Sequence, residues 1–217
     1  MILILTMLKS YSRIDVLGPV LIKSISGLKL MLIRYLLLVF LIFSSVAQSA
    51  FASKNIDSII DKLNEIDANV LLMRHAVAPG FGDPDNFVIK QCVTQRNLDV
   101  VGRHQAVSLG QRLKQSGIEI DKVYSSYWCR CLETAKLLKL GVVERFAGLN
   151  SFFEGHVDRD QTLHLLQKKL ANLDQSSLTL MVTHQVVIQA VTGMSVSSGS
   201  FVAYNSLTGE AARIIIE

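Results

Sequence analysis

Three short segments carry the side chains best suited to chemistry. Arg74 and His75 directly follow the apolar run 70–73, and His184 follows a second apolar run later in the chain. Arg130 lies near the start of a predicted helix. Guanidinium groups match phosphate oxygens with paired hydrogen bonds, and the free amides of a helix start add further donors. These residue types predict an anion site.

An anion site that also holds histidine is suited to phosphoryl transfer. Neutral imidazole is a competent nucleophile toward phosphorus, and a phosphohistidine divides one hydrolysis into two easier steps. The leaving alcohol needs a proton, so a carboxylic acid should lie beside the pocket. Glu154 is the first candidate and Asp158 the second. Glu133 is less suited, because we expect it to pair with an arginine on its own helix.

The residues around His75 predict how it is positioned. The run 70–73 is apolar without helical spacing, which is typical of a strand buried on both faces of a sheet. Pro79 and Gly80 then interrupt regular structure. We interpret residues 79–96 as a long loop that leaves from the strand end presenting His75. Loops of this length in compact domains are usually functional, so we expect it to form one wall of the site.

The rest of the chain alternates between helical and extended patterns. We predict helices over 54–67, 97–115, 127–140, 160–173 and 186–192, and further strands over 121–126, 142–146, 178–183, 200–204 and 211–216. Asn97 or Asp99 can cap the second helix, and Ser125 or Ser126 the third. Such alternation favours a mainly parallel sheet with helices on both faces, a three-layer α/β/α fold. Parallel strands place both histidines at one edge of the sheet.

The charge of the chain divides it into two parts. Residues 1–52 hold five basic residues and one acidic residue, and so carry the whole formal charge of +4. Residues 53–217 hold 17 basic and 17 acidic residues. We therefore predict an N-terminal extension over 1–52 and one domain over 53–217. The neutral domain gives no global electrostatic case for nucleic-acid binding.

The N-terminal part has the pattern of an export signal. Lys29 and Arg34 precede the apolar core 35–43, and the A-F-A sequence at 50–52 fits signal cleavage after a small residue. Met31 would give a signal of ordinary length, so translation could start there or at Met1. We expect a periplasmic or secreted protein.

An uncleaved anchor in the inner membrane is the alternative to export. The apolar stretch 35–47 is short for a membrane span, which needs about 20 residues. If the segment is retained, it is the only part that we expect to contact a membrane.

The three cysteines of the chain are of interest because an exported protein can form disulfides. Cys92 lies in the long loop, while Cys129 and Cys131 flank Arg130 and point to different faces if this segment is helical. At most one of these two should pair with Cys92. Three reduced, buried thiols are the alternative. No Cys or His spacing predicts a zinc site, and we expect no metal and no cofactor.

Four segments together resemble the histidine phosphatase superfamily, which has the phosphoglycerate mutase-like fold. That family carries an R-H-G motif, an L-[ST]-x-x-G-x-x-Q-A helix start, an S-S-x-x-x-R-x-x-x-T-A segment and a late V-[ST]-H-G motif. The corresponding sequences here are M-R-H-A at 73–76, N-L-D-V-V-G-R-H-Q-A at 97–106, S-S-Y-W-C-R-C-L-E-T-A at 125–135 and V-T-H-Q at 182–185. The likeness runs from about residue 69 to 205.

The resemblance implies roles for four residues. His75 would be the phosphorylated nucleophile, while Arg74, Arg130 and His184 would hold the phosphoryl group without a metal. The chain departs from the family pattern where Ala76 and Gln185 replace glycine. The short region after residue 146 resembles the compact branch of the family, which includes phosphohistidine phosphatases and exported sugar-phosphate phosphatases.

These observations lead to one expected function and two alternatives. We expect a hydrolase, an exported metal-independent phosphomonoesterase that acts through a phosphohistidine on a sugar phosphate or lipid-linked sugar phosphate. A resemblance to exported heptose-phosphate phosphatases of the lipopolysaccharide core indicates that substrate class. The alternatives are a phosphoprotein phosphatase of the phosphohistidine type and a non-catalytic domain that binds a phosphate ligand. The expected partner is a small phosphorylated substrate, and the oligomeric state stays open.

Overall fold

The computed structural model describes residues 31–36 and 59–214 of the chain. The chain divides into two compact units, Met1–Phe51 and Ala52–Glu217. In the first unit, residues 31–36 are helical and exposed. Most of the predicted export signal lies outside the described residues. Within the described part, no helix has the length and apolar character that a membrane crossing requires.

A six-stranded sheet forms the centre of the second unit. The strands are β1 (Val70–Arg74), β2 (Lys122–Ser125), β3 (Val143–Arg145), β4 (Thr179–Thr183), β5 (Phe201–Tyr204) and β6 (Ala211–Ile214). Their order is β3-β2-β4-β1-β5-β6. The first four in this order are parallel neighbours, whereas β5 runs antiparallel to β1 and β6 antiparallel to β5. The predicted mainly parallel sheet is confirmed.

Helices follow the strands as the sequence pattern predicts. They are α2 (Val100–Gln115), α3 (Cys129–Leu138), α4 (Arg159–Leu170) and α5 (Gln185–Thr192). Three single 3-10 turns, η1 (Cys92–Thr94), η2 (Ala147–Leu149) and η3 (Phe153–Gly155), lie in the loops. Residues 59–65 are also helical, and the beginning of the helix predicted over 54–67 lies outside the described residues.

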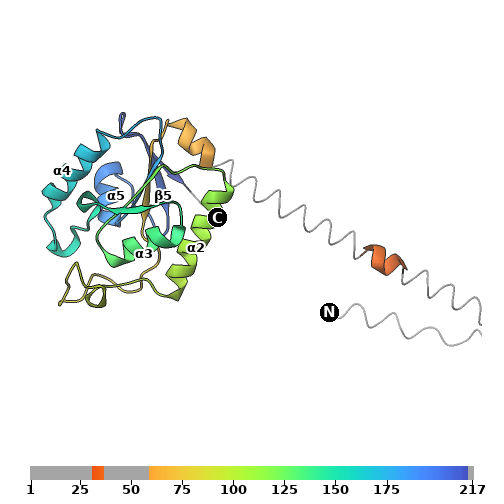
Figure 1. The fold of residues 1–217 in the computed structure, drawn as a ribbon, viewed down its shortest axis with the longest axis horizontal. Helices are drawn as coiled ribbons and strands as arrows, with labels where there is room; N and C mark the ends of the chain where they lie inside the picture. Colours follow the sequence, from red (N-terminus) through yellow and green to blue (C-terminus); the bar gives the residue numbers. More distant parts are fainter. Residues whose placement is uncertain (1–30, 37–58, 215–217) are drawn as a thin grey trace, which may run out of the picture. The chain divides into compact units, whose positions relative to one another are not determined.

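Two apolar clusters cover the two faces of the sheet. Side chains alternate along β1, so Leu71 and Met73 join one cluster while Val70 and Leu72 join the other. The first cluster packs against α2, α3 and residues 59–65, and the second against α4 and α5. Figure 1 shows α4 and α5 on one side of the strands and α2 on the other. The fold is a three-layer α/β/α arrangement.

The helix starts differ in how they are capped. Asp99 Oδ1 accepts a hydrogen bond from the Gly102 N–H and caps α2. Of the two caps predicted for this helix, Asn97 and Asp99, the structure has Asp99. The prediction that Ser125 or Ser126 caps α3 is wrong, because the cap residue is Trp128, without a side-chain cap bond. The chain turns once more after β2 before it becomes helical, and Ser126 Oγ accepts from the Trp128 N–H instead.

The pairing of β1 with β4 sets the position of both histidines. Arg74 lies opposite Thr183 in the parallel register, and the His75 N–H donates to the Thr183 carbonyl at 3.0 Å. His75 and His184 therefore leave neighbouring strands at the same level. This register brings residues 109 positions apart in the sequence to one point on the sheet edge.

A disulfide joins Cys92 to Cys129 and ties the long loop to the first residue of α3. Cys131 is a free, buried thiol. The prediction that at most one of the two flanking cysteines pairs with Cys92 is confirmed, and the alternative of three reduced thiols is wrong. The helix turn separates the two cysteines, so that Cys129 faces the loop while Cys131 packs against the sheet beside Thr183.

Candidate active site

A cavity of about 400 Å³ opens at the carboxyl ends of β1 and β4. Its lining comes from both strand ends, the long loop, α3 and α5. The lining residues are Arg74, His75, Ala78, Gly80, Phe81, Gly82, Arg96, Arg130, Ser151, Phe153, His184, Gln185, Val186 and Ser198. The structure thus brings together the four residues predicted to bind an anion, and the loop over 79–96 forms a wall of the cavity as expected.

His75 presents one ring nitrogen with a free lone pair. Its Nδ1 lies 2.7 Å from the Ala76 carbonyl oxygen, which can only accept, so Nδ1 carries the ring proton. Nε2 is then the unprotonated nitrogen. Burial, followed by the nearby positive charge of Arg130, lowers the pKa of His75 to about 3. The imidazole is therefore neutral near pH 7, as a nucleophile must be.

His184 lies beside His75, with 5.5 Å between the ring centroids. Its Nε2 is 3.0 Å from Ser126 Oγ and 3.4 Å from Cys131 Sγ. Burial, then the charge of Arg130, holds the pKa of His184 well below its usual value. The Ser126 hydroxyl donates to Asn150 Oδ1 at 3.1 Å, so Cys131 is the group that can donate to His184 Nε2. In that arrangement Nδ1 carries the ring proton and can donate it in a hydrogen bond to an anion.

Two arginines of the cavity each leave one buried donor without a partner. Arg74 Nη1 donates to the Val196 carbonyl at 2.8 Å, and the terminal nitrogens of Arg130 are bound to Asp83. The Nε atoms of both arginines are buried and unpaired among the described residues. Buried polar atoms are normally hydrogen-bonded, so these two donors are exceptions among the described residues.

Asp83 is the functional residue that the sequence pattern did not reveal. It comes from the long loop, and its side chain is only 3% exposed. It accepts hydrogen bonds from Arg130, from Trp128 Nε1 at 2.9 Å and from the Arg96 N–H at 2.9 Å. Burial alone would raise the pKa of Asp83, but these bonds and the charge of Arg130 outweigh it and hold the pKa below its usual value. In the sequence, the G-D-P run at 82–84 indicates only a turn.

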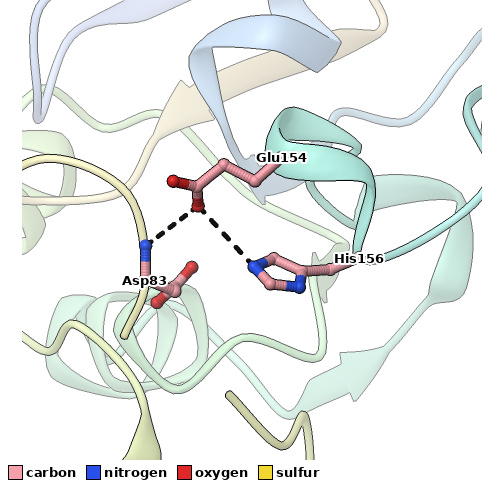
Figure 2. A group of neighbouring side chains, drawn as sticks. All are labelled: Asp83, Glu154 and His156. Atoms are coloured by element: carbon pink, nitrogen blue, oxygen red, sulfur yellow. Dashed lines mark hydrogen bonds and ion pairs between the residues drawn. The ribbon is translucent and has the colours of Figure 1, made fainter. Parts of the chain in front are cut away.

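Glu154 lies behind the cavity wall. Figure 2 shows its carboxylate between the Asp83 backbone and the His156 ring. Oε2 accepts from the Asp83 N–H at 2.9 Å and lies 3.6 Å from His156 Nε2. Glu154 itself does not line the cavity, although its neighbour Phe153 does.

The other carboxylates considered from the sequence have structural partners. Asp158 Oδ1 accepts from the Gln161 N–H and caps α4. The expectation that Glu133 pairs within its own helix is wrong, because it binds Arg103 of α2 at 2.6 Å. The close packing of α2 on α3 brings that side chain within reach.

The two departures from the family motifs are accommodated. Ala76 is fully buried, and its N–H donates to Thr134 Oγ1 at 3.0 Å. Its φ is not in the left-handed region, so the backbone here does not need glycine. Gln185 Oε1 accepts from the Val196 N–H at 2.8 Å, which holds the segment whose carbonyl positions Arg74.

One group of described side chains has the types and spacing of metal ligands. The donor atoms of Asp83, Glu154 and His156 lie within 4.8 Å of one another. Both oxygens of Asp83, however, already bind the guanidinium of Arg130, whose positive charge opposes a second cation. We therefore assign this group to holding the loop.

The fold and the site define an α/β domain with a cationic, histidine-containing anion pocket. The sequence model of the histidine phosphatase superfamily (branch 1) matches residues 70–150. The matched region contains Arg74, His75 and Arg130, so this part of the chain is similar to that superfamily. No curated protein shows a significant sequence match to the chain.

Solved structures similar to this chain include three phosphatases. A protein from Escherichia coli K-12, described as a putative α-ribazole-5′-phosphate phosphatase, is 18% identical with a TM-score of 0.51, over 68% of this chain and 95% of that one. The protein histidine phosphatase SixA, complexed with tungstate, is 17% identical with a TM-score of 0.46, over 66% and 92%. A mycobacterial glucosyl-3-phosphoglycerate phosphatase is 14% identical with a TM-score of 0.45, over 64% and 92%.

Proposed function

We propose that the protein is an exported phosphomonoesterase that acts on a sugar phosphate through a phosphohistidine at His75. The observation that carries this proposal is the position of His75. His75, whose Nε2 is unprotonated, lines the cavity together with Arg74, Arg130 and His184. A phosphoryl group there would lie beside two guanidinium groups while it presents its phosphorus to the imidazole.

The proposed reaction has two steps. In the first, the Nε2 lone pair of His75 forms a bond to phosphorus as the bond from phosphorus to the leaving oxygen breaks. Arg74, Arg130 and His184 donate to the phosphoryl oxygens and stabilise their charge. In the second, water attacks phosphorus, the N–P bond breaks, and inorganic phosphate leaves.

Glu154 is our proposed proton donor for the leaving alcohol. Its carboxylate lies directly behind Gly82 and next to Phe153, both of which line the cavity. In the first step a protonated Glu154 would give its proton to the leaving oxygen. In the second it would take a proton from the attacking water, which restores the starting state.

Three observations support the export and the substrate class in this proposal. The charge and apolar pattern of residues 29–52 is typical of export, and the disulfide Cys92–Cys129 fits the oxidising compartment to which export leads. The cavity of about 400 Å³ is of a size for a small ligand, in line with a sugar phosphate.

A phosphatase assay on matched proteins tests the proposal. We expect hydrolysis of p-nitrophenyl phosphate by the wild type in the presence of EDTA, and its loss in His75→Ala. Acid quenching during turnover should trap a phosphohistidine in the wild type only. Equal turnover by both proteins, or none in either, would favour the non-catalytic alternative. A panel of sugar phosphates, nucleotides and phosphohistidine peptides then ranks the substrates.

A further inference from the structure

Two aromatic rings lie at the rim of the catalytic cavity. Phe81 and Phe153 both line it, yet Phe81 is 87% exposed and Phe153 is 38% exposed. Their centroids are 5.1 Å apart and their planes are inclined by 86°, an edge-to-face contact. A ring as exposed as Phe81 buries little area and adds little to the stability of the fold.

Backbone contacts hold the two rings in place. Gly82, next to Phe81, has φ +69°, and a Cβ built there would lie too close to the carboxylate of Glu154. The Asp83 N–H donates to Glu154 Oε2 (Figure 2). The loop that carries Phe81 is thereby joined to the loop that carries Phe153. The edge-to-face contact and this hydrogen bond connect the two loops at two points, and a surface held in this way loses less entropy when a ligand binds.

The position of the phosphoryl group determines what meets these rings. In the proposed function that group lies beside His75 and Arg130, which line the cavity but are only 2% and 3% exposed. For in-line attack, the leaving oxygen must lie opposite the nucleophile, so the rest of the substrate extends away from His75. Phe81, exposed at the rim, lies in the part of the cavity that is open to solvent.

We propose that Phe81 and Phe153 form a leaving-group subsite for a ring with an apolar face, either the C–H face of a sugar or an aromatic ring. The inference deepens the proposed function and rests on it for the direction of the leaving group. Val186 adds an apolar side chain to the same lining. Contact between a flat apolar surface and an aromatic ring contributes more than its buried area alone.

Binding of non-hydrolysable phosphonates tests the subsite without turnover. By titration calorimetry, phenylphosphonate should bind the wild type more tightly than methylphosphonate. Phe81→Ala should weaken phenylphosphonate about tenfold and methylphosphonate less than about twofold, and Phe153→Ala should act in the same direction. Leu207→Ala is the matched control, because Leu207 is 79% exposed in the β5–β6 turn at the opposite edge of the sheet.

The turnover of three esters distinguishes the two kinds of ring. Phenyl phosphate and glucose 1-phosphate carry a ring, and glycerol 3-phosphate carries none. A selective loss of kcat/KM in Phe81→Ala for glucose 1-phosphate assigns the subsite to sugars, and one for phenyl phosphate alone assigns it to aromatic groups. Equal losses for all three esters and for both phosphonates would overturn the subsite. Phosphonate binding without turnover of any ester would instead overturn the proposed function, and absence of both would overturn the two together.

Discussion

Asp83 binds Arg130 through both of its carboxylate oxygens, with Oδ1 2.8 Å from Nη1 and Oδ2 3.1 Å from Nη2. The two side chains are only 3% and 4% exposed. The carboxylate therefore fixes the plane of the guanidinium and binds both of its terminal nitrogens. A loop residue thus orients a side chain of α3 that was expected to bind phosphate directly.

We predict that Asp83→Asn impairs phosphate binding more than chemistry. The neutral amide can accept from only one of the two nitrogens, so the guanidinium loses its fixed plane. Hydrogen bonds to charged groups contribute about 1.5–3 kcal/mol, so kcat/KM should fall about 10- to 100-fold, mainly through KM. Steady-state kinetics with p-nitrophenyl phosphate measures this. Asp85→Asn, an exposed change in the same loop, should have little effect.

The same variant should unfold more easily and gain less stability from phosphate. Loss of the Asp83 carboxylate would leave the Arg130 charge buried without a counter-charge, which costs about 3 kcal/mol. A ligand stabilises the folded state more when it binds that state more tightly, and phosphate should bind the variant more weakly. Thermal unfolding should therefore show a smaller stabilisation by phosphate in Asp83→Asn than in the wild type. An equal stabilisation would mean that Asp83 does not position Arg130 for phosphate.

The pKa of His75, about 3, predicts that stability falls in mild acid. An unfolded histidine binds a proton below about pH 6.5, whereas His75 in the folded protein stays neutral until about pH 3. Between these values the unfolded state binds more protons, so the free energy of unfolding rises with pH. His75 alone should account for a loss of about 2 kcal/mol between about pH 7 and about pH 5.

Urea unfolding at about pH 5 and about pH 7 measures this loss, and His75→Asn should reduce the difference between the two values. His184, whose pKa is lowered in the same direction, should contribute to the remaining slope. A pH dependence that is the same in wild type and variant would contradict the assignment of a neutral, buried His75.

The disulfide Cys92–Cys129 predicts a redox-dependent stability. It joins residues 37 positions apart, which constrains the unfolded chain by about 3–4 kcal/mol in the chain-entropy model. A reductant should lower the melting temperature of the wild type and leave that of Cys92→Ser/Cys129→Ser unchanged. Because the disulfide also anchors the loop that carries Asp83, reduction should raise KM.

The buried Cys131, whose pKa burial raises to about 12, should not react with iodoacetamide in the folded protein.

Glu154→Gln separates proton donation from loop positioning. If Glu154 protonates the leaving group, esters of poor leaving groups such as glycerol phosphate should lose about 100-fold in kcat. Esters of p-nitrophenol, which leaves without a proton, should lose much less. Both ester types should lose activity equally if Glu154 only holds the Asp83 backbone. Asp158→Asn, at the cap of α4, is the comparison for the second candidate donor.

Much of the fold could be predicted from the sequence because strong local signals coincide with buried elements. All four residues of the run 70–73 are apolar, and in the folded protein the side chains on both faces of this strand are buried. Helix caps were harder to predict from the sequence. Ser126, for example, accepts a hydrogen bond within the turn that precedes α3 and does not cap the helix. The partner of Glu133 was missed for a similar reason. Its contact with Arg103 depends on how two helices pack, and spacing within one helix does not show that.

The site was predicted in part for the same physical reason. His75 and His184 follow strands of a parallel sheet, so their meeting follows from topology. Asp83 and Phe81 lie in a loop, and no periodicity predicts where a loop side chain points. An acidic side chain in a short turn can point to solvent or bind a buried arginine. Only the folded loop shows that the Asp83 side chain binds Arg130. The same holds for the exposed aromatic at the cavity rim.

The β1–β4 register places the two imidazoles through backbone pairing, while the rim of the cavity is built by loops that no strand constrains. Under the proposed function, insertions or exchanges in those loops can alter which phosphate ester is accepted and leave the two histidines in place. Divergence toward new esters would then require few compensating changes, because the reactive core and the selective surface belong to different parts of the chain.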